Sequence, residues 1–301
     1  MKPLTAYTNM NKTYAPSELI INDDGSVFHL HIKPAQIASK IILVGDPERV
    51  KMISKYLDNI EFDIQNREFH SVTGFYKDKR VTVISTGIGC GNIDIVINEL
   101  DALANIDFNT RKDNDQKKCL EIVRIGTCGG LQENTKLGTY ICSMRSIGLD
   151  GLLNFYKQRQ EVCDLGMEKA FAEHLGWNNW RCAAYPYVSI ENEELTKRIA
   201  GKDSILGITV SAGGFYGPQG RFLRAEPADA IQNEKIESFS YNGMKITNYE
   251  MESSALAGLA SILGHKAACI CMVVANRRQK EAFTNYKLAM ENLVQKVLER
   301  I

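Results

Sequence analysis

The chain has 301 residues, of which 44% are hydrophobic, and its 36 basic and 36 acidic residues cancel to a formal net charge of zero. This length suits one α/β domain with additions, and the charge balance excludes a general nucleic-acid binder or a membrane-surface protein. The first 24 residues lack the apolar centre of a secretory signal, and no apolar run could span a bilayer. The eight cysteines show no metal-ligand spacing, so we expect reduced core thiols and a cytoplasmic protein.

The first part of the chain predicts a tail and an arm ahead of the main domain. Residues 1–24 are polar and are expected to lie loosely over the surface. The domain then spans 25–301. Apolar residues alternate with His29 and His31 over 27–32, which predicts a short strand or an extended arm.

The apolar run 40–44 predicts a buried parallel strand followed by a strand-to-helix turn. Gly45 allows a ligand to approach the backbone closely. Asp46 suits a helix N-cap and Pro47 the first helical turn. With Arg49 in the same turn, the stretch predicts an anion site, although a plain strand-turn-helix is the simpler alternative.

Further alternation of strands and helices follows. Residues 64–76 and 80–85 predict strands joined by a turn, and the glycine-rich turn 86–92 opens a helix over 93–103. That turn lacks the lysine of a Walker A loop and the spacing of a dinucleotide fingerprint. The polar stretch 107–119 predicts an exposed insertion.

A second buried strand, over 120–130, ends in glycines and carries Arg124 and Thr127 near its tip. The loop after another strand contains Phe215, Gln219 and Arg221 among glycines. An aromatic ring, an amide and a guanidinium suit a planar polar heterocycle, whereas an ordinary flexible loop is the alternative. Further strands are expected at 138–143, 205–211 and 267–274, and helices at 168–176 and 281–301.

Two carboxylates, Glu250 and Glu252, lie where a short strand at 244–246 leads into an apolar helix at 255–264. Ligands of open α/β sheets bind at the carboxyl ends of strands. A sugar diol offers two O–H donors to such a carboxylate. The alternative is that both residues only favour a helix N-terminus. The whole pattern predicts a single-domain, three-layer α/β/α fold with a mixed central sheet.

Four segments together resemble one family: Gly45–Arg49, Arg124–Thr127, Phe215–Arg221 and Asn248–Ser253. They are similar to the nucleoside phosphorylases of the hexameric, bacterial type, and within these to the uridine phosphorylases. The glycine and arginine segments are shared by the whole superfamily, whereas the Phe215–Arg221 loop resembles the uridine enzymes specifically. The resemblance runs from Val27 to the C-terminus, apart from the insertion.

The resemblance implies phosphate-dependent, reversible cleavage of uridine to uracil and ribose 1-phosphate, without a metal or organic cofactor. It also implies a homodimer as the smallest complete site, usually three dimers in a ring, with no nucleic-acid or membrane partner. Phosphate would be bound by Gly45, Arg49, Arg124, Thr127 and the neighbouring subunit's copy of Arg67. Ribose would be held by Met251, Glu252 and the supporting Glu250, with the neighbour's copies of His29 and Phe28. The base would contact Phe215, Gln219 and Arg221, and Arg277 would belong to a closing flap.

Two departures from the family pattern concern the base loop and a cation. Bacterial uridine phosphorylases read Phe-Tyr-Pro-Gly-Gln in the loop, whereas Gly217 and Pro218 stand here in the reverse order. Asn92 replaces a serine that helps to hold potassium in some members, while Glu68 is retained. A monovalent-cation site near Glu68 is therefore left open.

Three other functions compete with uridine phosphorolysis. A purine nucleoside phosphorylase is expected to carry an acid near the strand end at 273–276, where this chain has Asn276. A nucleosidase uses water and has no need of the Arg49 and Arg124 pair. A non-catalytic relative would have lost site residues, whereas the arginines and glutamates are all present.

Overall fold

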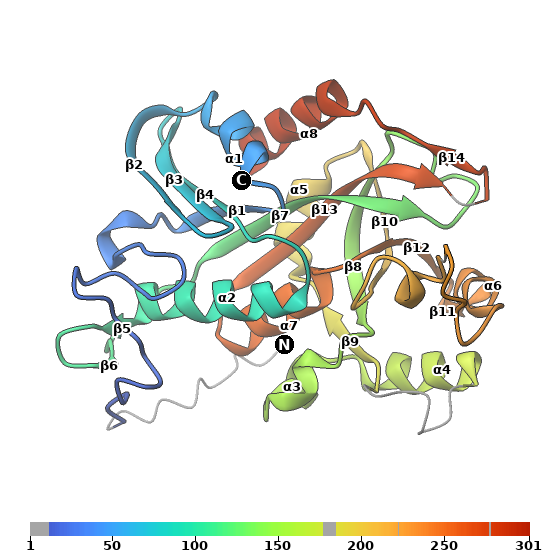
Figure 1. The fold of residues 1–301 in the computed structure, drawn as a ribbon, viewed down its shortest axis with the longest axis horizontal. Helices are drawn as coiled ribbons and strands as arrows, with labels where there is room; N and C mark the ends of the chain where they lie inside the picture. The colour runs from blue at the N-terminus through green and yellow to red at the C-terminus, as the bar shows by residue number, and fades with distance from the viewer. Residues whose placement is uncertain (1–11, 177–184, 222, 277) are drawn as a thin grey trace.

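The computed structural model describes residues 12–176, 185–221, 223–276 and 278–301 (Figure 1). The strands are β1 (Lys40–Val44), β2 (Asp58–Asn66), β3 (Phe69–Tyr76), β4 (Lys79–Ser85), β5 (Ile106–Asp107), β6 (Lys112–Asp113), β7 (Glu121–Gly130), β8 (Tyr140–Gly148), β9 (Tyr187–Ile190), β10 (Ser204–Ser211), β11 (Ser240–Tyr241), β12 (Met244–Glu250), β13 (Lys266–Asn276) and β14 (Glu281–Ala282). The helices are α1 (Pro47–Ser54), α2 (Cys90–Asn105), α3 (Arg159–Val162), α4 (Leu165–Leu175), α5 (Glu193–Ala200), α6 (Gln232–Ser238), α7 (Ser253–Ile262) and α8 (Lys287–Arg300). Short 3₁₀ helices are η1 (Pro34–Gln36), η2 (Leu152–Phe155) and η3 (Gly217–Gln219).

Both faces of the large sheet are covered by helices. In β1, Ile41 and Leu43 pack into one core with residues of α2 and α7, whereas Ile42 and Val44 pack into another with residues of α1, α5 and α8. Side chains alternate between the faces of a strand, so a continuous apolar run such as this one is buried on both sides. The predicted three-layer α/β/α architecture with a mixed sheet is confirmed, and Figure 1 shows α2 and α7 on one side with α1 and α8 on the other.

The order of strands brings distant parts of the chain to one edge. The sheet runs β11-β12-β10-β8-β13-β7-β1-β4-β3-β2, and an additional antiparallel pairing joins β12 to β7. That pairing, between Tyr249 and Gly129 and between Asn248 and Gly130, closes β12, β10, β8, β13 and β7 into a ring. As a result, the C-terminal end of β12 lies against that of β7.

Three local predictions differ from the structure. Residues 28–30 form a turn rather than a strand, with His31 at φ 56°, because the Glu99 carboxylate accepts the N–H groups of His29 and Leu30. The expected strand over 64–76 is broken at residues 67 and 68, which form the β2–β3 turn with Arg67 at φ 54°. The C-terminal helix begins at Lys287 rather than residue 281, because β14 pairs with the end of β13.

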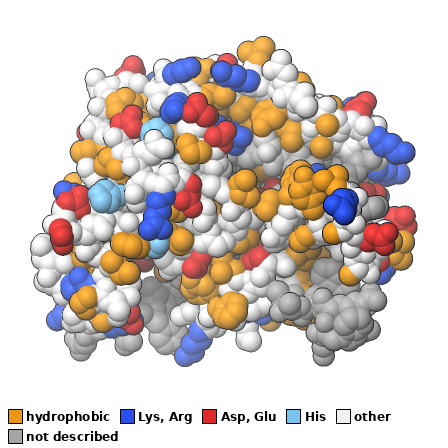
Figure 2. Space-filling model, viewed as in Figure 1, with side chains coloured by type: hydrophobic (Ala, Val, Ile, Leu, Met, Phe, Trp, Pro, Cys, Tyr) orange, Lys and Arg blue, Asp and Glu red, His pale blue; other side chains and the backbone are white. Residues whose placement is uncertain are grey.

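The start of the described chain lies against the polar insertion. The backbone N–H of Tyr14 donates to the Arg111 carbonyl at 2.8 Å, and the Tyr14 hydroxyl donates to Asp113 at 2.8 Å. The seven described cysteines are free, and six of them are buried as predicted, whereas Cys119 is exposed. No helix in the described ranges is long and apolar enough to cross a membrane. Acidic and basic side chains are scattered over the face in Figure 2, in keeping with the zero net charge.

Candidate functional site

A cavity of about 580 Å³ opens at the C-terminal ends of the parallel strands β1, β4, β7 and β13, beside the end of β12. Such strand ends are the usual ligand-binding edge of an α/β sheet. The cavity brings together residues predicted from all four motif segments. Its predicted members are Gly45, Arg49, Arg124, Thr127, Phe215, Gln219, Arg221, Glu250, Met251 and Glu252.

The turn after β1 has the local structure that its sequence predicts. The Asp46 side chain caps α1 by accepting the N–H of Glu48 at 2.9 Å, and Pro47 occupies the first helical turn. The Arg49 guanidinium donates to the carbonyl of Ile125 at 3.2 Å, which holds it toward β7. Burial lowers the pKa of Arg49, and the nearby charge of Arg124 lowers it further, so two cations share this side of the cavity.

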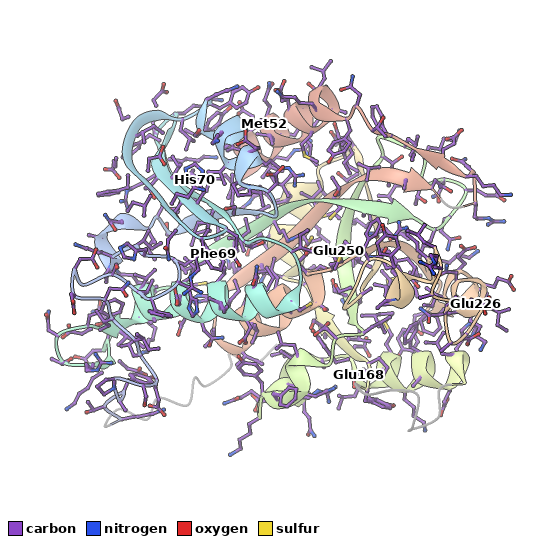
Figure 3. All side chains as sticks on the ribbon, viewed as in Figure 1. Met52, Phe69, His70, Glu168, Glu226 and Glu250 are labelled. Carbon is purple, nitrogen blue, oxygen red and sulfur yellow. The ribbon has the colours of Figure 1, made fainter. Side chains whose placement is uncertain are left out.

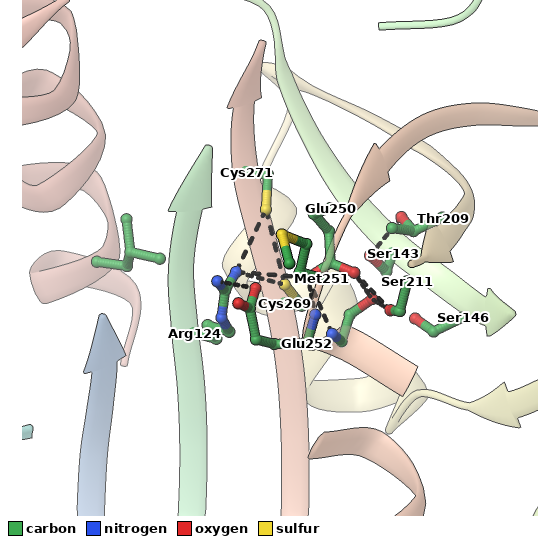
Figure 4. Close-up of polar contacts among 12 residues, drawn as sticks. Arg124, Ser143, Ser146, Thr209, Ser211, Glu250, Met251, Glu252, Cys269 and Cys271 are labelled. Carbon is green, nitrogen blue, oxygen red and sulfur yellow. Dashed lines mark hydrogen bonds and ion pairs between the residues drawn. The ribbon is translucent and has the colours of Figure 1, made fainter. Parts of the chain in front are cut away.

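Arg124 reaches the cavity only because a glycine stands two residues later on the same face of β7. A Cβ at Gly126 would lie 2.2 Å from the Nη1 atom of Arg124 and 2.7 Å from the Sγ atom of Cys271. No side chain tolerates contacts that short, so the guanidinium folds over the space that the glycine leaves. Around it, Nη2 pairs with Glu252, and Nη1 lies 3.5 Å from Glu250 (Figure 4).

Glu250 is engaged by the protein on both of its oxygens. Its Oε2 atom accepts the N–H groups of Glu252 and Ser253, each at 2.9 Å, and its Oε1 atom accepts the hydroxyls of Ser211 and Ser253 (Figure 4). Glu250 lies near the middle of the molecule in Figure 3. These bonds fix the backbone that carries Glu252. The alternative of helix-end stabilisation therefore describes part of what Glu250 does.

Glu252 is the N-cap of α7 and is almost fully buried, at 3% exposure. Its Oε1 atom accepts the N–H of Gly89 at 2.7 Å, so the glycine-rich turn before α2 binds a carboxylate of the chain itself. Burial raises the pKa of Glu252, the charge of Arg124 opposes the rise, and Glu250 adds to it. For Arg124, burial acts to lower the pKa, but Glu252 above all raises it, so the guanidinium stays charged.

The loop after β10 forms the other wall of the cavity. Arg221 stacks over the ring of Phe215, with the Cζ atom 4.0 Å from the ring centroid, and donates to the Phe215 carbonyl at 3.0 Å. It also donates to the Oε1 atom of Gln219, and the residue Gln219 is 3% exposed. Because arginine only donates, this bond requires Oε1 to be the acceptor and leaves the amide NH₂ of Gln219 as its remaining hydrogen-bonding group.

His29, Phe28 and Arg67 do not line this cavity. They lie together elsewhere: the Arg67 guanidinium is 5.6 Å from the Phe28 ring centroid, and the Phe28 and His29 rings are 4.8 Å apart. Glu99 binds the Nδ1 atom of His29 at 2.7 Å, and Asn66 donates to the His29 carbonyl at 2.8 Å. Within one chain, the cavity and this second cluster are therefore two separate groups of residues.

At the candidate cation position, Glu68 accepts a hydrogen bond from within the chain. Asn92 donates its amide to Glu68 at 3.2 Å and to the carbonyl of Thr86 at 2.7 Å, so a donor group occupies a carboxylate oxygen that a cation would need. The residues present therefore fit a monovalent cation poorly.

Arg277, predicted for a flap, lies outside the described residues.

Several cavity residues were not singled out from the sequence. Those on β7 and β13 have small or apolar side chains without a chemical signature, and only their position at strand ends could have indicated them. They are Cys128, Gly129, Val274 and Ala275, together with Gly87, Ile88, Tyr249 and Tyr286 from other elements.

A family model described as the phosphorylase superfamily matches residues 39–301. A uridine phosphorylase from Thermococcus kodakarensis is 31% identical over 90% of this chain and 85% of its own length. A uridine phosphorylase from Haemophilus influenzae is 30% identical over 85% of this chain and 88% of its own. A DeoD-type purine nucleoside phosphorylase from Bacillus subtilis is 28% identical over 81% and 85%.

Solved structures agree with this pattern. The crystal structure of a Trypanosoma brucei nucleoside phosphorylase, described as showing uridine phosphorylase activity, superposes with a TM-score of 0.84 at 30% identity, covering 94% of this chain and 98% of that one. A structure from work on two uridine phosphorylases of Phytophthora capsici superposes with a TM-score of 0.72 at 21% identity, over 96% and 98%. The second likeness concerns the fold alone.

Proposed function

The chain belongs to the phosphorylase superfamily, and from that membership we propose that it cleaves uridine with phosphate to give uracil and ribose 1-phosphate. The observation that carries this proposal is that one cavity contains both a pair of arginines and an aromatic–amide–guanidinium loop. A phosphorolytic pyrimidine site needs both, one for the anion and one for the base. The uridine phosphorylases among its relatives support the same substrates.

Phosphate binding is assigned to Gly45, Arg49, Arg124 and Thr127. The two guanidinium groups supply the charge that an oxyanion needs, and arginine pairs with phosphate in a bidentate manner. Glu252 accepts a hydrogen bond from Arg124, and that contact holds the guanidinium at the cavity.

Glu252 and Met251 are assigned to the ribose, with Glu250 as the support that fixes their backbone. As the glycosidic bond breaks, the sugar becomes oxocarbenium-like and phosphate attacks from the opposite face. A carboxylate such as Glu252 stabilises the hydroxyl-bearing face of that sugar by accepting hydrogen bonds. No covalent intermediate with the protein is needed.

The leaving base is assigned to Phe215, Gln219 and Arg221. Negative charge develops on the base as it leaves, and the stabilisation of that charge is assigned to Arg221. The NH₂ group of Gln219 donates, so it suits a carbonyl of uracil and opposes the amino group that cytosine carries at position 4. This pairing supports uracil over cytosine.

Two subunits are proposed to complete each site. His29 and Arg67 lie in a cluster outside their own chain's cavity, which supports their contribution to a neighbour's site in a homodimer, with three dimers in a ring as the larger assembly. Phosphate is a co-substrate, and no organic cofactor is proposed. The seven described cysteines are free thiols, which supports a location in the reducing cytoplasm.

The competing reactions have less support. Asn276, at the position where a purine enzyme is expected to carry an acid, donates its amide to the carbonyls of Gln132 and Thr135 and is 1% exposed. Its amide already donates to two backbone carbonyls, and an amide is not an acid that could protonate a purine. For a nucleosidase, the Arg49 and Arg124 pair would have no anion to bind.

The proposal is tested by incubating the purified protein with uridine, with and without phosphate, and identifying both products. We expect uracil and ribose 1-phosphate to form together, and only when phosphate is present. Uracil release with free ribose and no phosphate requirement would instead assign a nucleosidase.

A further inference from the structure

A second cavity of about 400 Å³ lies between β8, β9, α5, α7 and the start of β13, and it shares no lining residue with the first cavity. Its walls combine apolar and polar side chains. The apolar residues are Met144, Val162, Ile190, Leu206, Ala257 and Ala267, and the polar ones are Arg145, Glu191, Asn192, Glu193, Thr196, Lys197, Ser261 and His265. A cavity of this size is within the range of about 300–1,000 Å³ that holds small-molecule ligands.

Three buried polar side chains that line this cavity have unused hydrogen-bonding capacity. Within the described residues, the Oε2 atom of Glu191, the Oγ1 atom of Thr196 and the Nε2 atom of His265 have no hydrogen-bond partner, and the three residues are 4%, 2% and 6% exposed. A buried polar atom without a partner costs about 1–3 kcal/mol, so three of them beside one cavity need an explanation. A bound molecule that pairs with such atoms supplies it.

The charged residues around the cavity argue for an uncharged ligand. The Nε atom of Arg145 lies 3.5 Å from Asp164, and Lys197 pairs with Glu193 at 2.6 Å. His265 also lines the cavity: its Nδ1 atom accepts the N–H of Leu120, and its Nε2 atom lies 3.2 Å from Asp101 without a hydrogen bond. Since Arg145 and Lys197 each lie beside a carboxylate, their charges are already balanced within the protein.

We propose that this cavity is a second binding site, for an uncharged planar heterocycle of nucleobase size that pairs with Glu191 and Thr196. Glu191 and Thr196 come from the short segment 191–196, whereas apolar side chains on β9, β10, α7 and β13 supply other parts of the wall. A nucleobase combines two apolar ring faces with an edge of carbonyl and ring-nitrogen acceptors, so it can meet both kinds of lining. This inference does not depend on the reaction proposed for the first cavity.

The protonation of Glu191 agrees with this ligand class. Burial raises the pKa of Glu191 to about 8, the bond from Ser146 and the charge of Arg145 oppose the rise, and Glu250 adds to it. At neutral pH the side chain is therefore mostly a neutral acid. Ser146 donates to Oε1, so Oε2 can carry the proton and donate it to a ring carbonyl or ring nitrogen.

The test measures binding of adenine, hypoxanthine and cytosine to the intact protein by equilibrium dialysis, comparing wild type with Thr196→Val and Ala257→Leu. The valine variant removes the unpaired hydroxyl at nearly constant shape, and the leucine fills the cavity from α7. We expect one or more bases to bind, about fivefold to tenfold weaker binding in Thr196→Val, and loss of that binding in Ala257→Leu, with uridine cleavage unchanged in both. Failure of all three bases to bind, or binding that neither substitution alters, would overturn the proposal.

A second measurement checks the premise that the hydroxyl is unpaired. Thr196→Val should leave the melting temperature of the ligand-free protein unchanged or raise it, because no bond is lost. The matched control is Thr209→Val, where the hydroxyl bonds Ser143 at 2.7 Å and Asn248 at 3.0 Å, and this substitution should lower it. An equal fall in both variants would mean that Thr196 already has a partner, and would contradict the proposal.

Discussion

Arg124 keeps its positive charge inside the sheet because two carboxylates lie beside its guanidinium. It is 4% exposed, pairs with Glu252, and lies 3.5 Å from Glu250. Desolvation alone would make such a cation very costly, and the paired carboxylates offset that cost. The same pair is proposed to receive phosphate and ribose, so stability and activity depend on the same atoms.

Replacing Arg124 with alanine should therefore lower both stability and activity. The change leaves Glu252 buried without its partner, which costs about 3–5 kcal/mol of unfolding free energy. Phosphorolysis should fall at least about tenfold, since a lost charge-assisted bond is worth more than about 1.4 kcal/mol. The matched control is Arg198→Ala, because Arg198 pairs with Glu121 at the surface, where such a pair is worth only about 0–1 kcal/mol. Wild-type phosphorolysis with Arg124→Ala would remove this residue from the anion site.

Glu191 predicts a specific dependence of stability on pH. Its pKa is raised to about 8 in the folded protein from 4.5. The folded state therefore keeps a proton that the unfolded state releases between these values, so this contribution is fully present below about pH 4 and is lost as pH rises through about 8. Between pH 6 and 8, urea unfolding of the wild type should lose up to about 1.4 kcal/mol per pH unit relative to Glu191→Gln, which cannot titrate. Parallel curves for the two proteins would show that Glu191 is ionised in the fold.

At the scale of elements, β7 positions the site through a glycine. Gly126→Ala would place its Cβ 2.2 Å from the Arg124 guanidinium, so the arginine must leave its place over the strand. We expect at least about a tenfold loss of phosphorolysis, as for removal of Arg124 itself. The control is Gly91→Ala in α2, where a Cβ meets nothing within 4 Å and alanine favours the helix. Unchanged kinetics for Gly126→Ala would refute the described packing of Arg124.

The elements that could be predicted from sequence are those with strong local signals. The run 40–44 predicts β1 and the Asp46–Pro47 pair predicts the start of α1, because apolar continuity and capping chemistry act within a few residues. The turn at Arg67 gives no such signal, because a non-glycine residue adopts a positive φ there. The alternation over 27–32 resembles a strand, but Glu99, some 70 residues away, fixes it as a turn.

For the site, the types of the functional residues could be predicted, but their partners could not. The pairing of β12 with β7 brings Glu252 to Arg124, and only long-range sheet order decides that pairing. The sugar diol was one expected partner for the carboxylates, yet Arg124 and the Gly89 N–H already bind Glu252. The bond from Arg221 that orients Gln219 is likewise a tertiary feature.

At the scale of the whole molecule, the separation of His29 and Arg67 from the cavity predicts shared sites. Mixing His29→Ala and Glu252→Ala chains gives dimers in which one site has every residue intact and the other lacks both. With random assortment, about a quarter of the wild-type activity should return, although each variant alone is impaired. The measurement is phosphorolysis after subunit exchange, with mixed dimers identified by mass. No recovery in confirmed mixed dimers would place each complete site within one chain.

The assignment of the cavity to a pyrimidine nucleoside is tested most directly by comparing kcat/KM for uridine, cytidine and inosine at one phosphate concentration. A site whose buried polar groups are arranged for one base rejects a base that leaves them unpaired. With Arg221 bonded to the carbonyl end of Gln219, so that the amide NH₂ is left as a donor, we predict that uridine exceeds cytidine and inosine by about a hundredfold or more. Inosine cleaved as fast as uridine would contradict the pyrimidine assignment and leave only membership of the superfamily.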